Sequence, residues 1–286
     1  MQLSEIKLIY HKELSELYPK EEIDSFFFRS IEFYLKLERF ILVMQPNYTL
    51  SKSEERPLFE TLTRLVKEEP LQYIFKEATF MDLSFEVNEH TLIPRPETEE
   101  LVQWIIDDCS MKFNQDVKVL DIGTGSGCIA IALAANLKKL NIHAIDISQK
   151  ALSIAIKNSD RNKVNISFEK ADILDRNLSM NMQFDIIVSN PPYVRESEKD
   201  DMLNNVKNYE PNTALFVPDN DPVLFYKAIA YFSKKHLKNG GNLYLEINQY
   251  LGKETQQIFE QENFENISLK KDIFGNNRML KCSKNI

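Results

Sequence analysis

A glycine-rich loop between an apolar strand and an apolar helix constrains the fold of this chain more than any other feature. The chain has 7 glycines, and three of them, Gly123, Gly125 and Gly127, stand at alternate positions. Residues 117–122 before the loop read as a short strand, and residues 128–137 after it read as a helix. A strand, a glycine loop and a helix in this order form the first half of a nucleotide-binding βαβ unit. We therefore predict an α/β fold with a ligand bound at this loop.

The spacing of the glycines indicates the kind of ligand. Thr124 and Ser126 fill the variable positions of a Gly-x-Gly-x-Gly pattern, and Cys128 stands where a dinucleotide fingerprint needs its last glycine. A pyrophosphate site is therefore less favoured, and a ligand without phosphates fits better. Because glycine lets the backbone approach a ligand closely, we expect residues 123–127 to line the site.

Two acidic residues follow the next predicted strands. Asp146 stands directly after the second strand, at the position where ribose hydroxyls arrive in such units. Its alternative role is to cap the helix that begins near Ser148, and the two roles can coexist. Asp172 follows the third strand, where it would hold an adenine amino group while Ile173 packs against the ring. The alternative for Asp172 is an ordinary polar loop residue.

The stretch Asn190-Pro191-Pro192-Tyr193 ends the apolar strand of residues 184–189. Proline cannot donate to a sheet, so the Asn190 side chain and nearby carbonyls stay free at the end of the strand. In open α/β sheets, ligands bind at that end. The Asn190 oxygen and a backbone carbonyl could each accept one hydrogen of a planar NH₂ group, and Tyr193 could cover its flat face. An ordinary Asx-Pro turn is the alternative.

Together these motifs resemble the class I S-adenosylmethionine-dependent methyltransferases that modify an amide or amino nitrogen. Two further stretches narrow the resemblance: Pro-Leu-Gln-Tyr-Ile at residues 70–74 and Ile-Pro-Arg-Pro-Glu-Thr at residues 93–98. Both resemble the bacterial release factor glutamine methyltransferases, as does Glu-Pro-Asn-Thr-Ala-Leu at residues 210–215. The resemblance runs from about Pro70 to the C-terminus, with a similar helical N-terminal region.

The resemblance implies a doubly wound, mostly parallel, seven-stranded methyltransferase sheet and a defined reaction. The enzyme would transfer a methyl group from S-adenosylmethionine to the side-chain amide nitrogen of the glutamine in the Gly-Gly-Gln motif of class I release factors, leaving S-adenosylhomocysteine and using no metal. The cofactor would be bound by Gly123, Thr124, Gly125, Ser126, Gly127, Asp146, Asp172, Ile173 and Asn190. The catalytic motif would be Asn190, Pro191, Pro192 and Tyr193.

Two other enzyme classes and a binding scaffold compete with this interpretation. DNA adenine methyltransferases share the Asn-Pro-Pro-Tyr motif and use it on a flipped base, but the net charge of -8 disfavours broad attraction to nucleic acid. Ribosomal-protein glutamine methyltransferases tend to carry Pro-Arg-Ser-Pro where this chain has Pro-Arg-Pro-Glu. The intact Asn-Pro-Pro-Tyr motif counts against a scaffold that binds the cofactor without turnover. The chain departs from the family pattern at Asn248 and at residues 217–220.

Hydrophobic periodicity divides the chain into three predicted parts. Within residues 1–75, apolar residues such as Ile23, Phe27 and Ile31 recur at helical spacing, which predicts a small helical bundle. Because this bundle precedes every cofactor motif and has its own apolar stripe, we expect it to recognise the protein substrate. Residues 76–91 alternate apolar and polar side chains, as in a β-hairpin linker. Residues 92–286 would form the methyltransferase domain.

Cysteine usage and hydropathy favour a cytoplasmic protein. Cys109, Cys128 and Cys282 lack metal or redox spacing and fit reduced core thiols. We expect no signal peptide, because the first residues lack a basic segment followed by an apolar one. No apolar run approaches the roughly 20 residues of a membrane span, so no membrane association is expected either.

Overall fold

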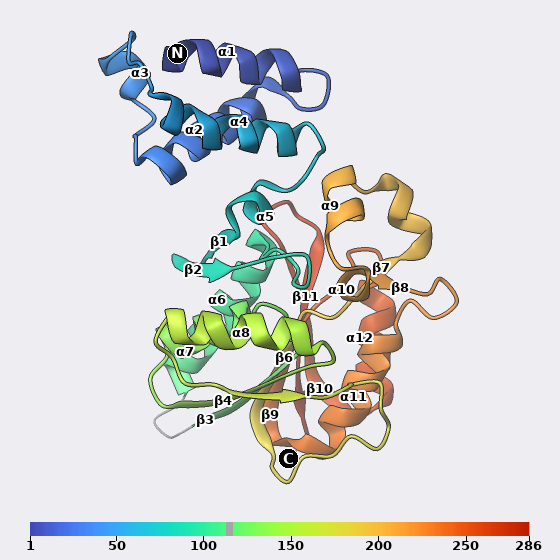
Figure 1. Ribbon diagram of the computed structural model, residues 1–286. Coiled ribbons are helices and arrows are strands. Elements are labelled where there is room, and N and C mark those ends of the chain that lie inside the picture. Colours follow the sequence, from blue (N-terminus) through green and yellow to red (C-terminus); the bar gives the residue numbers. More distant parts are fainter. Residues whose placement is uncertain (113–116, 286) are drawn as a thin grey trace. The chain divides into compact units, whose positions relative to one another are not determined.

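The computed structural model describes residues 1–112 and 117–285, and the chain divides into two compact units (Figure 1). The first unit comprises Met1–Lys76 and Leu203–Tyr209, and the second comprises Glu77–Met202 and Glu210–Ile286. Residues 113–116 and 286, which fall in the predicted 92–286 domain, lie outside the described residues. The short Leu203–Tyr209 segment joins the N-terminal unit although it is distant in sequence.

The first unit is a helical bundle with an apolar interior. Ile23, Phe27 and Ile31 are buried on one face of a single helix, because residues four positions apart share a face. The Tyr10 ring packs edge-on against Phe27, and its hydroxyl donates to the Leu58 carbonyl at 2.6 Å. The helices are α1 (Leu3–Leu14), α2 (Lys20–Leu35), α3 (Ile41–Met44), α4 (Lys52–Leu65), α5 (Leu71–Phe75) and α9 (Asn204–Tyr209).

Hydrogen bonds tie α9 to the end of α4 and the residues that follow it. The Tyr209 hydroxyl donates to the Lys67 carbonyl at 2.6 Å, and Asn204 Nδ2 donates to the Glu68 carboxylate. A segment inserted late in the chain therefore completes the N-terminal unit.

The second unit is built on a seven-stranded sheet in the order β10-β11-β9-β6-β3-β4-β5. The five strands from β9 to β5 run parallel, whereas β11 is antiparallel to both β9 and β10. This confirms the predicted doubly wound, mostly parallel sheet. The strands are β3 (Val117–Ile122), β4 (Leu140–Asp146), β5 (Ser167–Lys170), β6 (Phe184–Ser189), β9 (Leu237–Glu246), β10 (Phe264–Lys271) and β11 (Asn277–Lys284).

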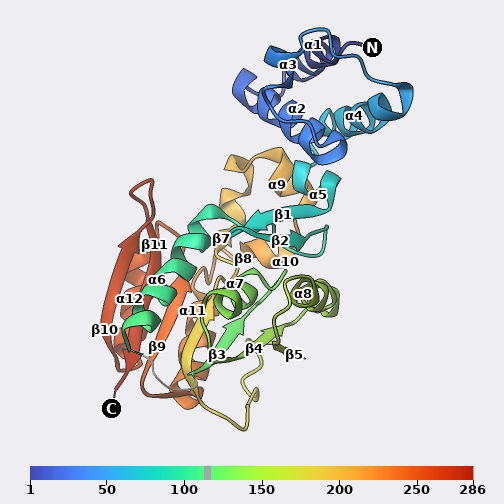
Figure 2. The ribbon, with the colours of Figure 1, turned by 90° about the vertical axis from the view of Figure 1, so that its left-hand side faces the viewer.

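Helices cover both faces of this sheet (Figures 1 and 2). One layer contains α6, α7 and α8, and the other contains α11 and α12. The strands between them are nearly continuous apolar runs, as expected where both faces are buried. The helices are α6 (Pro96–Lys112), α7 (Cys128–Asn136), α8 (Gln149–Arg161), α11 (Leu224–His236) and α12 (Gly252–Gln261).

A hairpin precedes the sheet, as the alternating pattern predicted. Strands β1 (Glu77–Phe80) and β2 (Leu83–Glu86) pair antiparallel around Met81 and Asp82. Both turn residues have positive φ angles, 49° and 60°, which suit the right-handed twist of a two-residue hairpin. The hairpin clusters with the second unit.

Short elements complete the region after the Asn-Pro-Pro-Tyr motif. Strand β7 (Val194–Arg195) pairs in parallel with β8 (Phe216–Val217). Between them lie the 3-10 helix η1 (Glu196–Asp201), α9, and α10 (Asn212–Leu215). No helix within residues 1–112 and 117–285 is long and apolar enough to cross a membrane.

The sheet register brings the predicted motifs to one edge. Ile122, the last residue of β3, is opposite Ile145 on β4 and Ser189 on β6. Asp146, the last residue of β4, is opposite Lys170 on β5. The loops that follow these parallel strands therefore start side by side at their carboxyl ends, where ligands bind in such sheets.

Candidate active site

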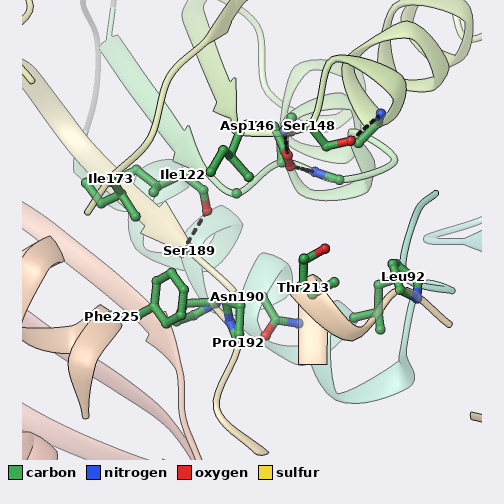
Figure 3. Close-up of a pocket in the computed structure, with 18 of the residues that line it drawn as sticks. Leu92, Ile122, Asp146, Ser148, Ile173, Ser189, Asn190, Pro192, Thr213 and Phe225 are labelled. Carbon is green, nitrogen blue, oxygen red and sulfur yellow. Dashed lines mark hydrogen bonds between the residues drawn. The ribbon is translucent and has the colours of Figure 1, made fainter. Parts of the chain in front are cut away.

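A cavity of about 400 Å³ opens at this carboxyl edge of the second unit (Figure 3). Its volume lies within the roughly 300–1,000 Å³ of small-molecule sites. The loops after β3, β4, β5 and β6 contribute Gly123, Thr124, Gly125, Ser126, Asp146, Asp172, Ile173, Asn190, Pro191 and Pro192 to its lining. Further parts of the wall come from residues 90–98, from the starts of α7 and α8, and from segments around Pro211–Pro218 and Leu224–Phe225. Gly127 and Tyr193 are absent from the lining.

Backbone hydrogen bonds hold the glycine loop in place. The Gly123 and Thr124 N–H groups both donate to the Ile145 carbonyl, at 2.8 and 3.0 Å. The Gly125 N–H donates to Asp146 Oδ2 at 2.8 Å. The Gly125 φ of 57° suits glycine, and the loop presents its main chain to the cavity.

Gly127 allows helices α7 and α8 to pack closely. Its φ is 83°, and a Cβ at this position would lie 2.9 Å from Ile131 Cδ1 and 3.2 Å from Ala155 Cβ. Ile131 belongs to α7 and Ala155 to α8, so the absence of a side chain lets the two helices approach at the start of α7. This placement agrees with opening a helix without a Cβ clash, whereas the structure gives Gly127 no place in the cavity wall.

Asp146 links the glycine loop to the start of α8. Its Oδ1 accepts from the Ser148 N–H at 2.8 Å, while Oδ2 accepts from Gly125. The helix cap itself comes from Ser148, whose Oγ accepts from the Ala151 N–H at 3.2 Å. Burial raises the pKa of Asp146, and the two backbone donors oppose that rise. Asp146 also borders the cavity (Figure 3), where its remaining lone pairs are available to hydroxyl groups.

Asp172 and Ile173 occupy the loop after β5 and both line the cavity. Asp172 Oδ1 accepts from the Leu174 N–H at 2.8 Å, which makes a local turn. Figure 3 shows Ile173 near Ile122 at one side of the cavity. The two residues thus combine a carboxylate with an apolar surface, which is what a flat ring carrying an amino group requires.

Two titratable groups lie beneath the glycine loop. Asp121 is fully buried, accepts from Thr124 Oγ1 at 2.6 Å, and has its pKa raised to about 7 by burial. Cys128 lines the cavity, and burial raises the pKa of its thiol to about 12. The thiol is therefore neutral near pH 7, and a neutral thiol is a poor nucleophile.

The Asn190 amide has a defined orientation. Its Nδ2 donates to Thr98 Oγ1 at 3.1 Å, and Thr98 in turn donates to Glu246 Oε2 at 2.6 Å. Within the described residues, Asn190 Oδ1 has no hydrogen-bond partner, and Asn190 lines the cavity. Pro191 is buried beside it, and Pro192 and Phe225 flank it (Figure 3).

Tyr193 lies away from the cavity lining. Its hydroxyl donates to Glu246 Oε1 at 2.9 Å, and its ring packs against the core of the second unit. Its carbonyl accepts from Asn248 Nδ2 at 2.9 Å. The structure thus places the Tyr193 side chain where it anchors the loop, and it does not place the ring over the cavity as the sequence suggested.

The two departures from the family pattern form part of the support around this loop. Asn248 also donates from its backbone to Tyr226, and its Oδ1 accepts from the Tyr250 N–H. Within residues 217–220, Asp219 Oδ1 accepts from the Ser197 hydroxyl at 2.8 Å. Both positions therefore make defined hydrogen bonds.

Three buried polar residues near the site were not predicted as site residues from the sequence. Glu246 ends a strand and holds Thr98 and Tyr193. Glu210 makes an ion pair with Arg95 and accepts from the Ile93 N–H at 3.1 Å, which joins two walls of the cavity. Asn158 joins the hairpin to the glycine loop. Two signals were available: Glu210 begins the motif at residues 210–215, and Glu246 is an acidic residue at the end of an apolar run.

Asn158 contacts two segments of backbone that are distant in the sequence. Its Oδ1 accepts from the Glu86 N–H at 2.6 Å, and its Nδ2 donates to the carbonyls of Glu86 and Ser126. The hairpin strand β2 is thereby tied to the glycine loop through one fully buried amide. Nothing in the sequence around Asn158 marks it for this role.

The described part of the chain holds no cluster of three or more His, Cys, Asp or Glu side chains that could bind a metal ion. The polar side chains that line the cavity include the Asp146 and Asp172 carboxylates, the Asn190 amide, hydroxyl groups, His90, and Arg95, whose guanidinium is paired with Glu210. Such a set suits a neutral or cationic organic ligand.

Comparison with known proteins adds independent information. Residues 103–208 match the family described as "Methyltransferase small domain", and residues 18–75 match the "PrmC N-terminal domain". A release factor glutamine methyltransferase from Flavobacterium psychrophilum is 49% identical, covering 94% of this chain and 95% of the relative. One from Bacteroides thetaiotaomicron is 40% identical, covering 99% of this chain and all of the relative.

A solved structure resembles the fold. It is a 16S rRNA methyltransferase from T. thermophilus in complex with AdoMet and guanosine, and it has a TM-score of 0.53 to this chain. It is 17% identical and covers 73% of this chain and 50% of its own length. This likeness concerns the methyltransferase fold alone.

Proposed function

The chain belongs to the release factor glutamine methyltransferase family, and on that premise we propose that it transfers a methyl group from S-adenosylmethionine to the side-chain amide nitrogen of the glutamine in the Gly-Gly-Gln motif of class I release factors. One observation of the site carries the proposal furthest. Asn190 lines the cavity, and its amide turns the NH₂ group to Thr98 and leaves Oδ1 without a partner among the described residues, as recognition of a substrate NH₂ group requires.

The residues of the cavity fit S-adenosylmethionine. The main chain of residues 123–126 would border the methionine part, and Asp146 would accept hydrogen bonds from the ribose hydroxyls. Asp172 and Ile173 would hold the adenine, the first at its amino group and the second against its face. When bound, the cofactor would supply an activated methyl group on a sulfonium sulfur.

The chain's own part in the reaction would be to hold the glutamine amide. An amide nitrogen delocalises its lone pair into the carbonyl, so its attack depends on close positioning in line with the methyl group. Asn190 Oδ1 and the Pro191 carbonyl would accept the two amide hydrogens and aim the nitrogen. These acceptors would also stabilise the positive charge that develops on the nitrogen. Asn190 and Pro191 would therefore be the residues that contact the reacting group.

We also propose that the N-terminal unit contacts the release factor. The support is a group of exposed apolar side chains on α3 and directly before it: Phe40, Val43 and Met44, each at least 68% exposed. Exposed apolar clusters of this kind commonly mark protein-binding surfaces. Replacing Val43 and Met44 by Ser should raise KM for the release factor and leave cofactor affinity unchanged. An unchanged KM would contradict this role.

A methyl-transfer assay with radiolabelled cofactor tests the function directly. The purified protein would be offered a class I release factor, double-stranded DNA and ribosomal protein in parallel. Label on the release factor alone is the expected result. Label on the DNA would favour an adenine methyltransferase, and label on the ribosomal protein would favour the sister glutamine methyltransferases. A release factor substrate would also imply work in the cytoplasm, where translation takes place.

A further inference from the structure

A buried hydrogen-bond relay connects Glu246 to Asn190 through Thr98. Thr98 Oγ1 donates to Glu246 Oε2 at 2.6 Å, and Asn190 Nδ2 donates to Thr98 Oγ1 at 3.1 Å. Thr98 is 2% exposed and Glu246 is 1% exposed, so water does not compete for these bonds. Thr98 lies in the first turn of α6 and Glu246 is the last residue of β9. Both residues belong to the same unit as Asn190, and Thr98 also lines the cavity.

The relay has a fixed direction when Glu246 is ionised, because its members then differ in donor capacity. Burial raises the pKa of Glu246, and the Thr98 and Tyr193 hydroxyls and the Arg278 charge oppose that rise. An ionised carboxylate only accepts hydrogen bonds, and a hydroxyl has a single hydrogen to donate. The Thr98 hydrogen is used on Glu246, so Thr98 Oγ1 can only accept from Asn190. The Asn190 amide must then turn its NH₂ group to Thr98 and its oxygen to the other side.

This direction decides what Asn190 can recognise. The oxygen and NH₂ ends of an amide have nearly the same shape, and hydrogen-bond partners decide which end points where. Without an acceptor at Thr98, a half-turn of the amide would present NH₂ to the cavity. An NH₂ group cannot accept a hydrogen from a substrate amide, so the flipped side chain would oppose binding of the reacting nitrogen.

We propose that Thr98 and Glu246 are positioning residues for methyl transfer, with Glu246 fixing the direction of the Thr98 hydroxyl and Thr98 fixing Asn190 Oδ1 as the acceptor in the cavity. The inference rests on the proposed function, because it needs Asn190 to hold the substrate amide.

Glu246 also supports both ends of the Asn-Pro-Pro-Tyr motif. Its second oxygen accepts from the Tyr193 hydroxyl at 2.9 Å. One buried carboxylate thus holds the first residue of Asn-Pro-Pro-Tyr through Thr98 and the last residue directly. Tyr193 contributes to the geometry of the loop from outside the cavity wall.

A matched pair of substitutions tests the relay. Thr98→Val keeps the shape of the side chain and removes the hydroxyl, whereas Thr98→Ser keeps the hydroxyl. Outer residues that orient a functional group commonly change activity by 10- to 100-fold, so kcat of Thr98→Val on the release factor should fall by about that factor. Thr98→Ser should retain most of kcat. Calorimetry should show nearly unchanged affinity of both variants for S-adenosylhomocysteine. Equal kcat in the two variants would overturn the proposal.

Glu246→Gln provides a second variant if Thr98→Val does not fold. Thr98 and Tyr193 donate to different oxygens of Glu246, and a Gln side chain replaces one of these oxygens with an NH₂ group that cannot accept. Its kcat should also fall while cofactor affinity is retained. An unchanged kcat would contradict the role of Glu246.

A double-mutant cycle separates orientation from general support. In the Asn190→Ala background the amide is gone, so Thr98→Val should cause no further loss of kcat. A further loss of the same size as in the wild-type background would show that Thr98 acts elsewhere, and would overturn the relay.

The orientation of the amide has a readout that does not depend on the substrate. Nuclear magnetic resonance of the Asn190 side-chain NH₂ group in the full-length protein should show one hydrogen shifted by its bond to Thr98. The shift should be lost in Thr98→Val and kept in Thr98→Ser. Absence of that difference would refute the relay. Failure to methylate release factors would refute only the proposed function.

Discussion

The two sides of the cavity are held in different ways. On the side of the glycine loop, most supporting bonds go to the neighbouring strand: Gly123 and Thr124 donate to Ile145, and Gly125 donates to Asp146. The Asn158 side chain adds a bond to the Ser126 carbonyl. On the side of Asn190, the supporting groups come from far along the chain, because Thr98 is 92 positions away and Glu246 is 148 positions from Thr98. The first side depends mainly on backbone geometry, and the second depends mainly on buried side chains.

We therefore expect substitutions on the two sides of the cavity to have different effects. A change on the glycine side should act on cofactor affinity or on stability, since backbone conformation and helix packing are set there. A change on the Asn190 side should act on the rate of methyl transfer, since that side aims a single amide. The following predictions test this separation.

Asn190→Ala should produce the largest effect. Removing one preorganised hydrogen-bond partner of a reacting group lowers kcat by roughly 10²–10³. Affinity for S-adenosylhomocysteine should change much less, because most of the cofactor wall is untouched. Steady-state kinetics and calorimetry measure the two quantities, and Asn220→Ala, at an exposed position outside the cavity, is the control. A loss of cofactor affinity as large as the loss of kcat would contradict a separate role for the Asn190 side of the cavity.

Asp146→Ala should weaken cofactor binding by tenfold or more. Charge-assisted hydrogen bonds are worth about 1.5–3 kcal/mol each, and the substitution also removes the acceptor of the Gly125 N–H. Calorimetry with S-adenosylhomocysteine gives the affinity, and the thermal unfolding midpoint checks the fold. Unchanged affinity would reject the ribose role and leave Asp146 as a loop-stabilising residue.

Gly127→Ala should destabilise the protein by about 1–3 kcal/mol, because the added Cβ would overpack the α7–α8 contact and the backbone has a positive φ. Gly275→Ala is a matched control: its φ is 85°, and a Cβ there would meet nothing within 4 Å. Denaturant unfolding of both variants isolates the packing effect. Equal losses would mean that only the backbone conformation matters at Gly127.

The smallest predicted effect is a dependence of folding stability on pH. Burial raises the pKa of Asp121 to about 7 in the folded state. The folded protein therefore holds a proton that the unfolded chain has already released, and stability is lost as pH rises. The expected loss is about 1 kcal/mol from about pH 6 to about pH 7.

Asp121→Asn removes the titrating group behind this loss. Its stability should vary less over the same interval, while Asp160→Asn, at an exposed position, should behave like the wild type. Urea unfolding at both pH values measures the difference. A wild-type slope in Asp121→Asn would contradict the assignment.

Local patterns in the sequence predicted the fold well. The strand before Asn190 and the strand before the glycine loop begin and end where the apolar runs do, because both are buried in a parallel sheet. The hairpin also followed from its alternating pattern. The insertion of residues 203–209 into the N-terminal unit was not predicted, because it depends on contacts with residues such as Lys67.

The site was less predictable where its geometry depends on distant residues. Ten of the twelve residues predicted for the site line the cavity, and each of them lies at or shortly after the end of a strand. The relay was not predicted, because no local pattern reveals that Thr98 and Glu246 meet next to Asn190. The position of Tyr193 depends on the same meeting, so its side chain was expected on the wrong side of the loop.

Mass spectrometry of a class I release factor treated with the protein and S-adenosylmethionine tests the central claim most directly. The peptide that carries the Gly-Gly-Gln motif should gain the mass of one CH₂ group, and fragmentation should place it on the glutamine side chain. The Asn190→Ala variant should add it far more slowly under the same conditions. A methyl group on another peptide, or one added at the full rate by Asn190→Ala, would contradict the account.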